Sequence, residues 1–123
     1  MNPRFLSPLI VQELEDESND GRGTWRVIAE LMYYSAITGS VIRVPGGFKT
    51  DFASVPRLPF VFALAGDTAH EASVVHDYLY TVKSTTRRQA DAVLLEASVV
   101  SGVPKWRARL MWLGVRIGGA SHW

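Results

Sequence analysis

The pattern of apolar residues changes near the middle of the chain, and this change limits the fold more than any other feature of the sequence. Up to residue 50, short runs rich in strand formers are separated by turn residues such as Pro45, Gly46 and Gly47. Beyond residue 68, apolar residues recur at the spacing of helices with one buried face. The sequence therefore predicts an α+β fold, in which a small antiparallel β meander from the N-terminal half packs on a layer of about three α-helices from the C-terminal half.

Local signals place the individual elements. We expect strands at 9–11, 24–34, 41–44 and 48–50, and helices at 68–82, 86–101 and 104–118. Two capping boxes mark helix starts, Thr68 with Glu71 and Thr86 with Gln89, because each pair can satisfy the other's unpaired backbone amides. Pro104 is expected at the first position of the third helix. The short connection between the first two helices predicts that they are antiparallel neighbours.

The composition indicates one ordinary globular domain spanning residues 1–123, since apolar residues make up 47% and charged residues 20% of the chain. The formal net charge is +1, so no nucleic-acid partner is expected. The chain has no cysteine, which excludes disulfides and thiolate metal sites. We expect no signal peptide and no transmembrane segment, because residues 1–10 are interrupted by proline and no apolar run reaches the roughly 18 residues of a span.

The candidate site centres on a histidine in the first helix and an aspartate in the second. His76 and Tyr80 are four residues apart, so they share a helix face. His76 lies about six residues before the end of its helix and Asp91 about five after the start of the next, which places them at nearly the same height on antiparallel neighbours. The sequence therefore predicts that the His76 and Asp91 side chains meet.

Such a pair has a catalytic and a structural interpretation. A carboxylate bonded to one ring nitrogen fixes the histidine tautomer and stabilises the imidazolium that forms on proton abstraction. His76 is therefore a candidate general base toward water, supported by Asp91, with the Tyr80 hydroxyl steadying that carboxylate. The alternative is a structural hydrogen bond that fixes the register of the two helices.

A calcium site is a further candidate. Asp77 points about 100° away from His76 on the helix. With the backbone carbonyls of the 44–48 loop, which contains Gly46 and Gly47, Asp77 is a candidate ligand for Ca²⁺, a cation that prefers oxygen ligands. A cation there would polarise an ester carbonyl.

The connector that follows the last expected strand is a candidate part of the site as well. Its prolines prevent a regular helix, and loops on a rigid scaffold often carry functional residues. Its polar members are Asp51, Ser54 and Arg57. These three side chains are therefore candidates to line the site.

Four segments resemble a small phage-borne family of unknown function, domain of unknown function 1353. They are Phe-Lys-Thr-Asp-Phe-Ala-Ser-Val-Pro-Arg at 48–57, His-Asp-Tyr-Leu-Tyr at 76–80, Arg-Gln-Ala-Asp at 88–91, and the C-terminal 115–123. The resemblance covers nearly the whole chain. It implies a phage or prophage origin and no established activity.

A second, local resemblance concerns the helical hairpin. His-Asp-x-x-Tyr on one helix followed by Ala-Asp on the next is similar to the active site of phospholipase A2. That resemblance implies His76 as base, Asp77 as calcium ligand, and Tyr80 and Asp91 as supporting residues. The glycine-rich calcium loop of that family is matched only in part, by Pro45-Gly46-Gly47, which lies farther upstream than in that family.

The third expected helix carries tryptophan and basic residues together. We expect the tryptophan and leucine side chains of this amphipathic helix to face the core. The alternative is a surface for phospholipid headgroups or for a partner protein, because Trp and Arg favour such interfaces. The residues concerned are Lys105, Trp106, Arg107, Arg109, Trp112 and Arg116.

Two functional hypotheses follow. The leading one is a phage-encoded hydrolase that uses the His–Asp site to activate water against an ester such as a phospholipid. The alternative is a non-catalytic virion, tail or assembly component, with other phage proteins as partners. A hydrolase should leave His76 reachable from a pocket, whereas the alternative should bury His76 and expose an apolar patch. Either protein is expected in the host cytoplasm or the virion.

Overall fold

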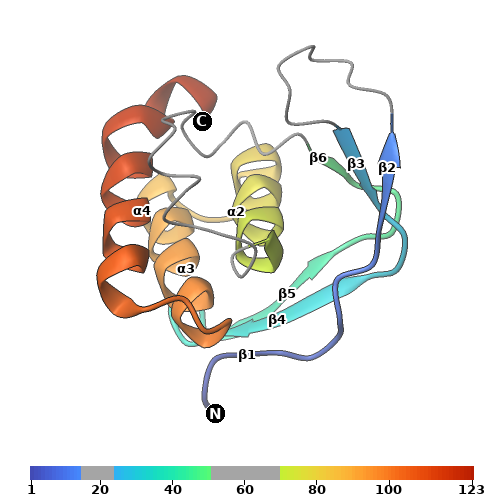
Figure 1. The fold of residues 1–123 in the computed structure, drawn as a ribbon, viewed down its shortest axis with the longest axis horizontal. Helices are drawn as coiled ribbons and strands as arrows, with labels where there is room; N and C mark the ends of the chain where they lie inside the picture. Colours follow the sequence, from blue (N-terminus) through green and yellow to red (C-terminus); the bar gives the residue numbers. More distant parts are fainter. Residues whose placement is uncertain (15–23, 51–69) are drawn as a thin grey trace.

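The computed structural model describes residues 1–14, 24–50 and 70–123. Strands occupy the N-terminal half and helices the C-terminal half, so the predicted α+β fold is confirmed (Figure 1). No helix within these ranges has the length and apolar character needed to cross a bilayer.

The strands form two antiparallel sheets. One sheet has the order β1-β4-β5, from Arg4–Phe5, Leu31–Ser35 and Ser40–Val44. The other has the order β2-β3-β6, from Val11–Leu14, Thr24–Val27 and Lys49–Thr50. Strand pairing within both sheets is antiparallel throughout.

The sheets differ from the expected meander in three respects. The predicted strand at 24–34 is interrupted by a bend at Ala29, so its halves become β3 and β4 and join different sheets. β6 therefore pairs with β3, in the register Trp25 with Thr50, rather than with the preceding β5. The β1 strand had no counterpart in the sequence prediction.

Three helices follow in the described part: α2 (His70–Val82), α3 (Arg87–Val100) and α4 (Lys105–Gly118), with a final 3-10 turn, η1, at Gly119–His122. The capping box at α3 is present as predicted, because Thr86 accepts from the Gln89 amide and the Gln89 side chain accepts from the Thr86 amide. Pro104 is the N-cap of α4, one residue before the predicted position. The other predicted box begins at Thr68, outside the described residues.

The core lies between the sheets and the helical layer. Leu31 and Tyr33 of β4 and Val44 of β5 are fully buried, as alternation along a strand requires. They contribute to one core cluster with the buried faces of the helices. α3 packs beside β4 and α2 beside β5, whereas α4 packs on α3 and η1 (Figure 1).

α4 departs from the expected orientation. Its core side consists of Ala108, Met111 and Val115. The expectation that its tryptophan and leucine side chains face the core is wrong for three of them, since Trp106, Leu110 and Leu113 are exposed. The helix therefore carries apolar residues on its outer side as well.

A carboxylate on α3 ties the helical layer to the hairpin between β4 and β5. The Glu96 Oε1 atom accepts from the buried Tyr33 hydroxyl at 2.7 Å, and Oε2 accepts from the Ala36 and Ile37 amides, both at 3.2 Å. Burial, with the hydrogen bond to Glu96, raises the pKa of Tyr33 well above its ordinary value. The hydroxyl therefore stays protonated and donates.

Replacing Glu96 with alanine is expected to lower the free energy of unfolding by about 2 kcal/mol, because hydrogen bonds to a charged group are lost and their donors stay partly buried. Urea denaturation measures this change. Glu30→Ala is the matched control, since Glu30 forms an exposed ion pair with Arg43 at 2.9 Å. Such pairs contribute at most about 1 kcal/mol. Equal effects of the two variants would contradict the prediction.

Candidate functional site

The predicted contact between His76 and Asp91 is present. His76 Nε2 lies 2.8 Å from Asp91 Oδ1, and both side chains are 0% exposed. α2 and α3 pack against each other as neighbours, and the helical hairpin brings the two positions together as their spacing required. The geometry expected from the sequence is therefore found, although the role of the pair is a separate question.

Asp91 also receives hydrogen bonds that tie three helices together. The Tyr80 hydroxyl donates to Oδ1 at 2.6 Å, and Arg116 of α4 donates to Oδ2 at 2.8 Å. Arg87, one turn before Asp91 on α3, lies 3.6 Å from Oδ2. We call this set, formed by His76, Tyr80, Arg87, Asp91 and Arg116, the Asp91 cluster.

The electrostatics of the cluster favour an ionised aspartate. Burial acts to raise the pKa of Asp91, but the hydrogen bonds from His76, Tyr80 and Arg116 outweigh it and lower the pKa below its ordinary 3.8. Burial, together with the hydrogen bond to Asp91, raises the pKa of Tyr80. At neutral pH, Asp91 is therefore a carboxylate and Tyr80 a protonated donor.

Two guanidinium groups balance the charge of the aspartate. The Asp91 carboxylate faces both Arg87 and Arg116, so its negative charge is compensated within the cluster. His76 contacts the same carboxylate from a fully buried position. Pairing with opposite charges and hydrogen-bond donors is what makes the burial of a carboxylate tolerable.

Aromatic packing holds Tyr80 in place. Its ring lies 4.3 Å from the His76 ring, centroid to centroid, and 5.1 Å from the ring of Trp123, which meets it edge-on. On another side it meets the backbone of Gly119, where an added Cβ would lie 2.6 Å from the Tyr80 hydroxyl oxygen. The chain thus needs a residue without a side chain at position 119.

Gly119→Ala is expected to lower the free energy of unfolding by about 1–3 kcal/mol, because the new methyl displaces the hydroxyl from Asp91. Thermal unfolding measures the change. The control is Ala120→Gly, at the exposed neighbouring position. Gly39→Ala would not serve as a control, because Gly39 has a positive φ. An unchanged midpoint for Gly119→Ala would show that Tyr80 can move without loss.

The predicted calcium ligands lie on two elements that approach each other. Asp77 is half-buried on α2, and Gly46 and Gly47 lie in the turn between β5 and β6. That turn is tied to β3, since Gly47 donates to the carbonyl of Val27 at 2.7 Å. The segment also contacts α2, because the Phe48 and Tyr78 rings meet edge-on at 5.4 Å between centroids.

The donor set for a cation is limited in the described part of the chain. Among residues 1–14, 24–50 and 70–123, no cluster of three or more His, Asp or Glu side chains is placed to hold a metal ion. The calcium site at Asp77 stays a prediction. Asp51, Ser54 and Arg57, the predicted lining residues, lie outside the described residues.

Sequence reasoning missed the two arginines of the cluster. Arg87 could have been found, because it precedes Asp91 by four residues on the same helix, the spacing of a helical ion pair. Arg116 gave no such signal. It is 25 residues from Asp91 in sequence, and the contact depends on how α4 packs on α3.

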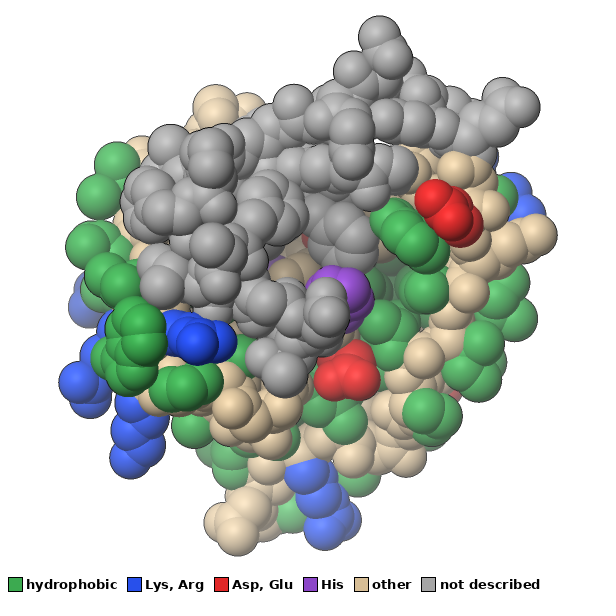
Figure 2. Space-filling model, viewed as in Figure 1, with side chains coloured by type: hydrophobic (Ala, Val, Ile, Leu, Met, Phe, Trp, Pro, Cys, Tyr) green, Lys and Arg blue, Asp and Glu red, His purple; other side chains and the backbone are tan. Residues whose placement is uncertain are grey.

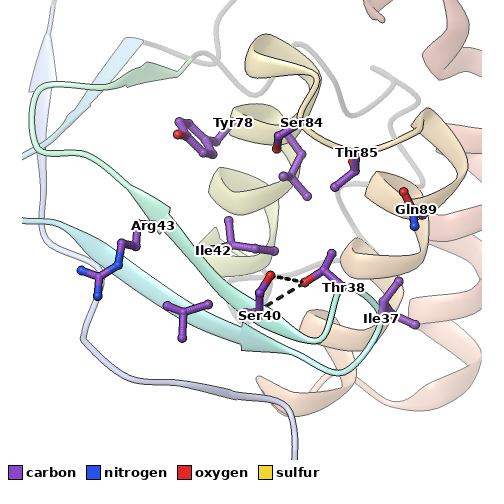
Figure 3. Close-up of a pocket in the computed structure, with 11 residues that line it drawn as sticks. Ile37, Thr38, Ser40, Ile42, Arg43, Tyr78, Ser84, Thr85 and Gln89 are labelled. Atoms are coloured by element: carbon purple, nitrogen blue, oxygen red, sulfur yellow. Dashed lines mark hydrogen bonds between the residues drawn. The ribbon is translucent and has the colours of Figure 1, made fainter.

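A separate cleft lies between β5 and the connection from α2 to α3 (Figure 3). It has a volume of about 490 Å³, and none of the Asp91 cluster lines it. Thr38 and Ser40 face Ser84, Thr85 and Gln89 across the opening. Its lining residues are Ile37, Thr38, Ser40, Val41, Ile42, Arg43, Tyr78, Leu79, Ser84, Thr85 and Gln89. These are mainly hydroxyl, amide and aliphatic groups, which are suited to binding rather than proton transfer.

Comparison with known proteins identifies a family. The family model described as "Protein of unknown function (DUF1353)" matches residues 25–115. This range contains four of the five members of the Asp91 cluster, and Arg116 directly follows it. Searches of curated proteins and of solved structures returned no match.

Proposed function

This chain belongs to the family of proteins of unknown function DUF1353, and we propose that it acts by binding rather than by catalysis, with the Asp91 cluster as a structural clamp. The observation that carries this proposal is the complete burial of His76 and Asp91. In this role, the cluster holds the helical layer in one arrangement. The protein would then be a virion, tail or assembly component of a phage or prophage, the origin that its motifs imply.

The hydrogen bonding of Asp91 supports the proposal. Both carboxylate oxygens accept short hydrogen bonds, from partners on α2 and α4. A polar network saturated in this way specifies one packing of the surrounding helices. A general base, in contrast, needs a path for substrate to the imidazole, and the complete burial of His76 argues against that role.

A phospholipase A2-like hydrolase is the second candidate, and one observation favours it. That observation is the contact between His76 Nε2 and Asp91 Oδ1 at 2.8 Å, the imidazole–carboxylate pair that the resemblance implies. In such a hydrolase, His76 would take a proton from water, the water oxygen would attack the ester carbonyl, and the proton would pass from His76 to the leaving alkoxide. The Tyr80 hydroxyl on the same carboxylate is the support that this resemblance implies.

The deciding experiment measures stability and turnover together. His76→Ala is expected to lower the free energy of unfolding by about 3 kcal/mol, because Asp91 loses a donor and a cavity forms. On phospholipid vesicles, wild type is expected to release no fatty acid, with Ca²⁺ or with chelator. The stability control is Val82→Ala, at an exposed position on the same helix (44%), for which a change within about 0.5 kcal/mol is expected.

Calcium-dependent turnover would overturn the proposal if His76→Ala and Asp77→Ala abolished it while remaining folded. Such a result would establish the hydrolase and require His76 to become accessible on substrate binding. Stability of His76→Ala equal to that of wild type would also contradict the clamp.

A further inference from the structure

The outer side of α4 carries an apolar stripe that no described element covers. Trp106, Leu110, Leu113 and Ile117 recur at intervals of four, three and four residues, so at about 100° per residue they fall within one narrow sector of the helix. We call them the outer stripe. Their exposed fractions are 57%, 40%, 45% and 77%, respectively.

The position of the stripe is opposite to the packed side of the helix. Ala108, Met111 and Val115 face α3 and the core, and about half a turn separates them from the stripe. A helix that is apolar on two opposite sides usually has a neighbour on each. A contiguous exposed apolar surface of this kind marks an interaction site.

Basic residues border the stripe. Lys105 and Arg109 are exposed on one flank, and on the other the Arg107 guanidinium lies 5.5 Å from the centroid of the Trp106 ring. From residue 97 to the C-terminus the chain contains no Asp or Glu. Hydrophobic and basic side chains gather where α4 lies, on the left of the view (Figure 2).

We propose that the outer stripe of α4 docks on the surface of an anionic lipid bilayer. Trp and Leu enter the boundary between headgroups and acyl chains, while flanking Lys and Arg attract anionic headgroups. A bilayer therefore offers a partner both for the apolar stripe and for its basic flanks. A second copy of the chain would bring the same basic flanks and no acidic ones, so its charges would oppose association.

This inference does not depend on the role of the Asp91 cluster, because binding to vesicles is measured without turnover. The probe is a set of vesicles of phosphatidylcholine alone or with phosphatidylglycerol. Wild type is expected to co-sediment with the anionic vesicles, with about tenfold weaker binding to the neutral ones and a loss of binding at high salt. The fluorescence of exposed Trp106 is expected to shift to shorter wavelength on binding.

The variant Leu113→Gln/Ile117→Gln tests the stripe itself, and glutamine preserves helix propensity. It is expected to weaken vesicle binding about tenfold or more, with an unchanged thermal midpoint because both residues are exposed. The matched control is Ile28→Gln/Val82→Gln, at exposed positions outside α4 (51% and 44%), which should bind as wild type does. Lys105→Gln/Arg109→Gln should weaken binding to anionic vesicles only.

Three results would overturn the proposal. The first is no binding to either type of vesicle. The second is equal weakening in the stripe variant and its control, which would indicate nonspecific adsorption. The third is that wild type does not bind vesicles but dimerises with increasing concentration in ultracentrifugation, and that Leu113→Gln/Ile117→Gln abolishes the dimer. That result would assign the stripe to a second copy of the chain.

Discussion

Replacing Asp91 with alanine is expected to lower the free energy of unfolding by about 3–5 kcal/mol, the usual cost of removing one partner from a buried charged network. Three donors lose their acceptor together, namely His76, the Tyr80 hydroxyl and Arg116. Since domains of this size are stable by about 5–15 kcal/mol, the loss is a large share of the total. Urea denaturation of wild type and variant measures it as a shift of the midpoint.

The same helix offers a matched control. Ser98 lies two turns after Asp91 on α3 and is equally buried, but its hydroxyl makes no hydrogen bond to the described residues. Ser98→Ala should therefore change the free energy of unfolding by less than about 1 kcal/mol, and it can stabilise the chain. If Asp91→Ala and Ser98→Ala had equal effects, the clamp would have no energetic basis.

The helical hairpin was predictable because its determinants are local. The capping box at Thr86 fixes where α3 begins, and the short connection fixes its direction relative to α2. Once both are fixed, the positions of His76 and Asp91 follow from the rise per residue. The contact is therefore encoded within a segment of about twenty residues.

The two sheets were not predictable in the same way, because their pairing is not local. The bend at Ala29 divides a run rich in strand formers, with apolar residues at odd-numbered positions on both sides of the bend (Trp25, Val27, Leu31 and Tyr33). Periodicity cannot show that the chain changes direction there. The pairing of β6 with β3 rather than β5 follows from that bend.

The orientation of α4 was likewise not predictable from the pattern of apolar residues. Apolar residues occupy both its packed side and its outer stripe, so the sequence pattern allows either side to face the core. The small residue Ala108 lies on the packed side, where a close approach to α3 is possible. The larger Trp106 and Leu113 are left outside. Packing volume thus decides between two sides that hydrophobicity alone does not distinguish.

Acid is expected to remove the contribution of Asp91 to stability. Because the folded-state pKa of this carboxyl lies below its ordinary 3.8, the unfolded chain binds more protons as the pH falls. The contribution is complete at pH values well above 3.8 and is lost progressively as the pH falls from there through the folded-state value. Other carboxylates also titrate in this range, so wild type alone cannot isolate the effect.

Comparison of wild type with Asp91→Asn isolates the contribution of the Asp91 charge to stability, because the amide has nearly the shape of a protonated carboxyl and does not titrate. Near neutral pH the variant should be less stable than wild type, since the amide cannot accept from Arg116 and the Tyr80 and His76 donors as a carboxylate does. As the pH falls below about 4, the difference in free energy of unfolding should shrink toward zero, because protonation makes wild-type Asp91 resemble the amide. Urea denaturation of both proteins between pH 7 and pH 2.5 would measure the difference. A difference that stays constant over this range would mean that the pKa of Asp91 is the same in the folded and the unfolded chain, and the clamp would then not depend on the charge of the carboxylate.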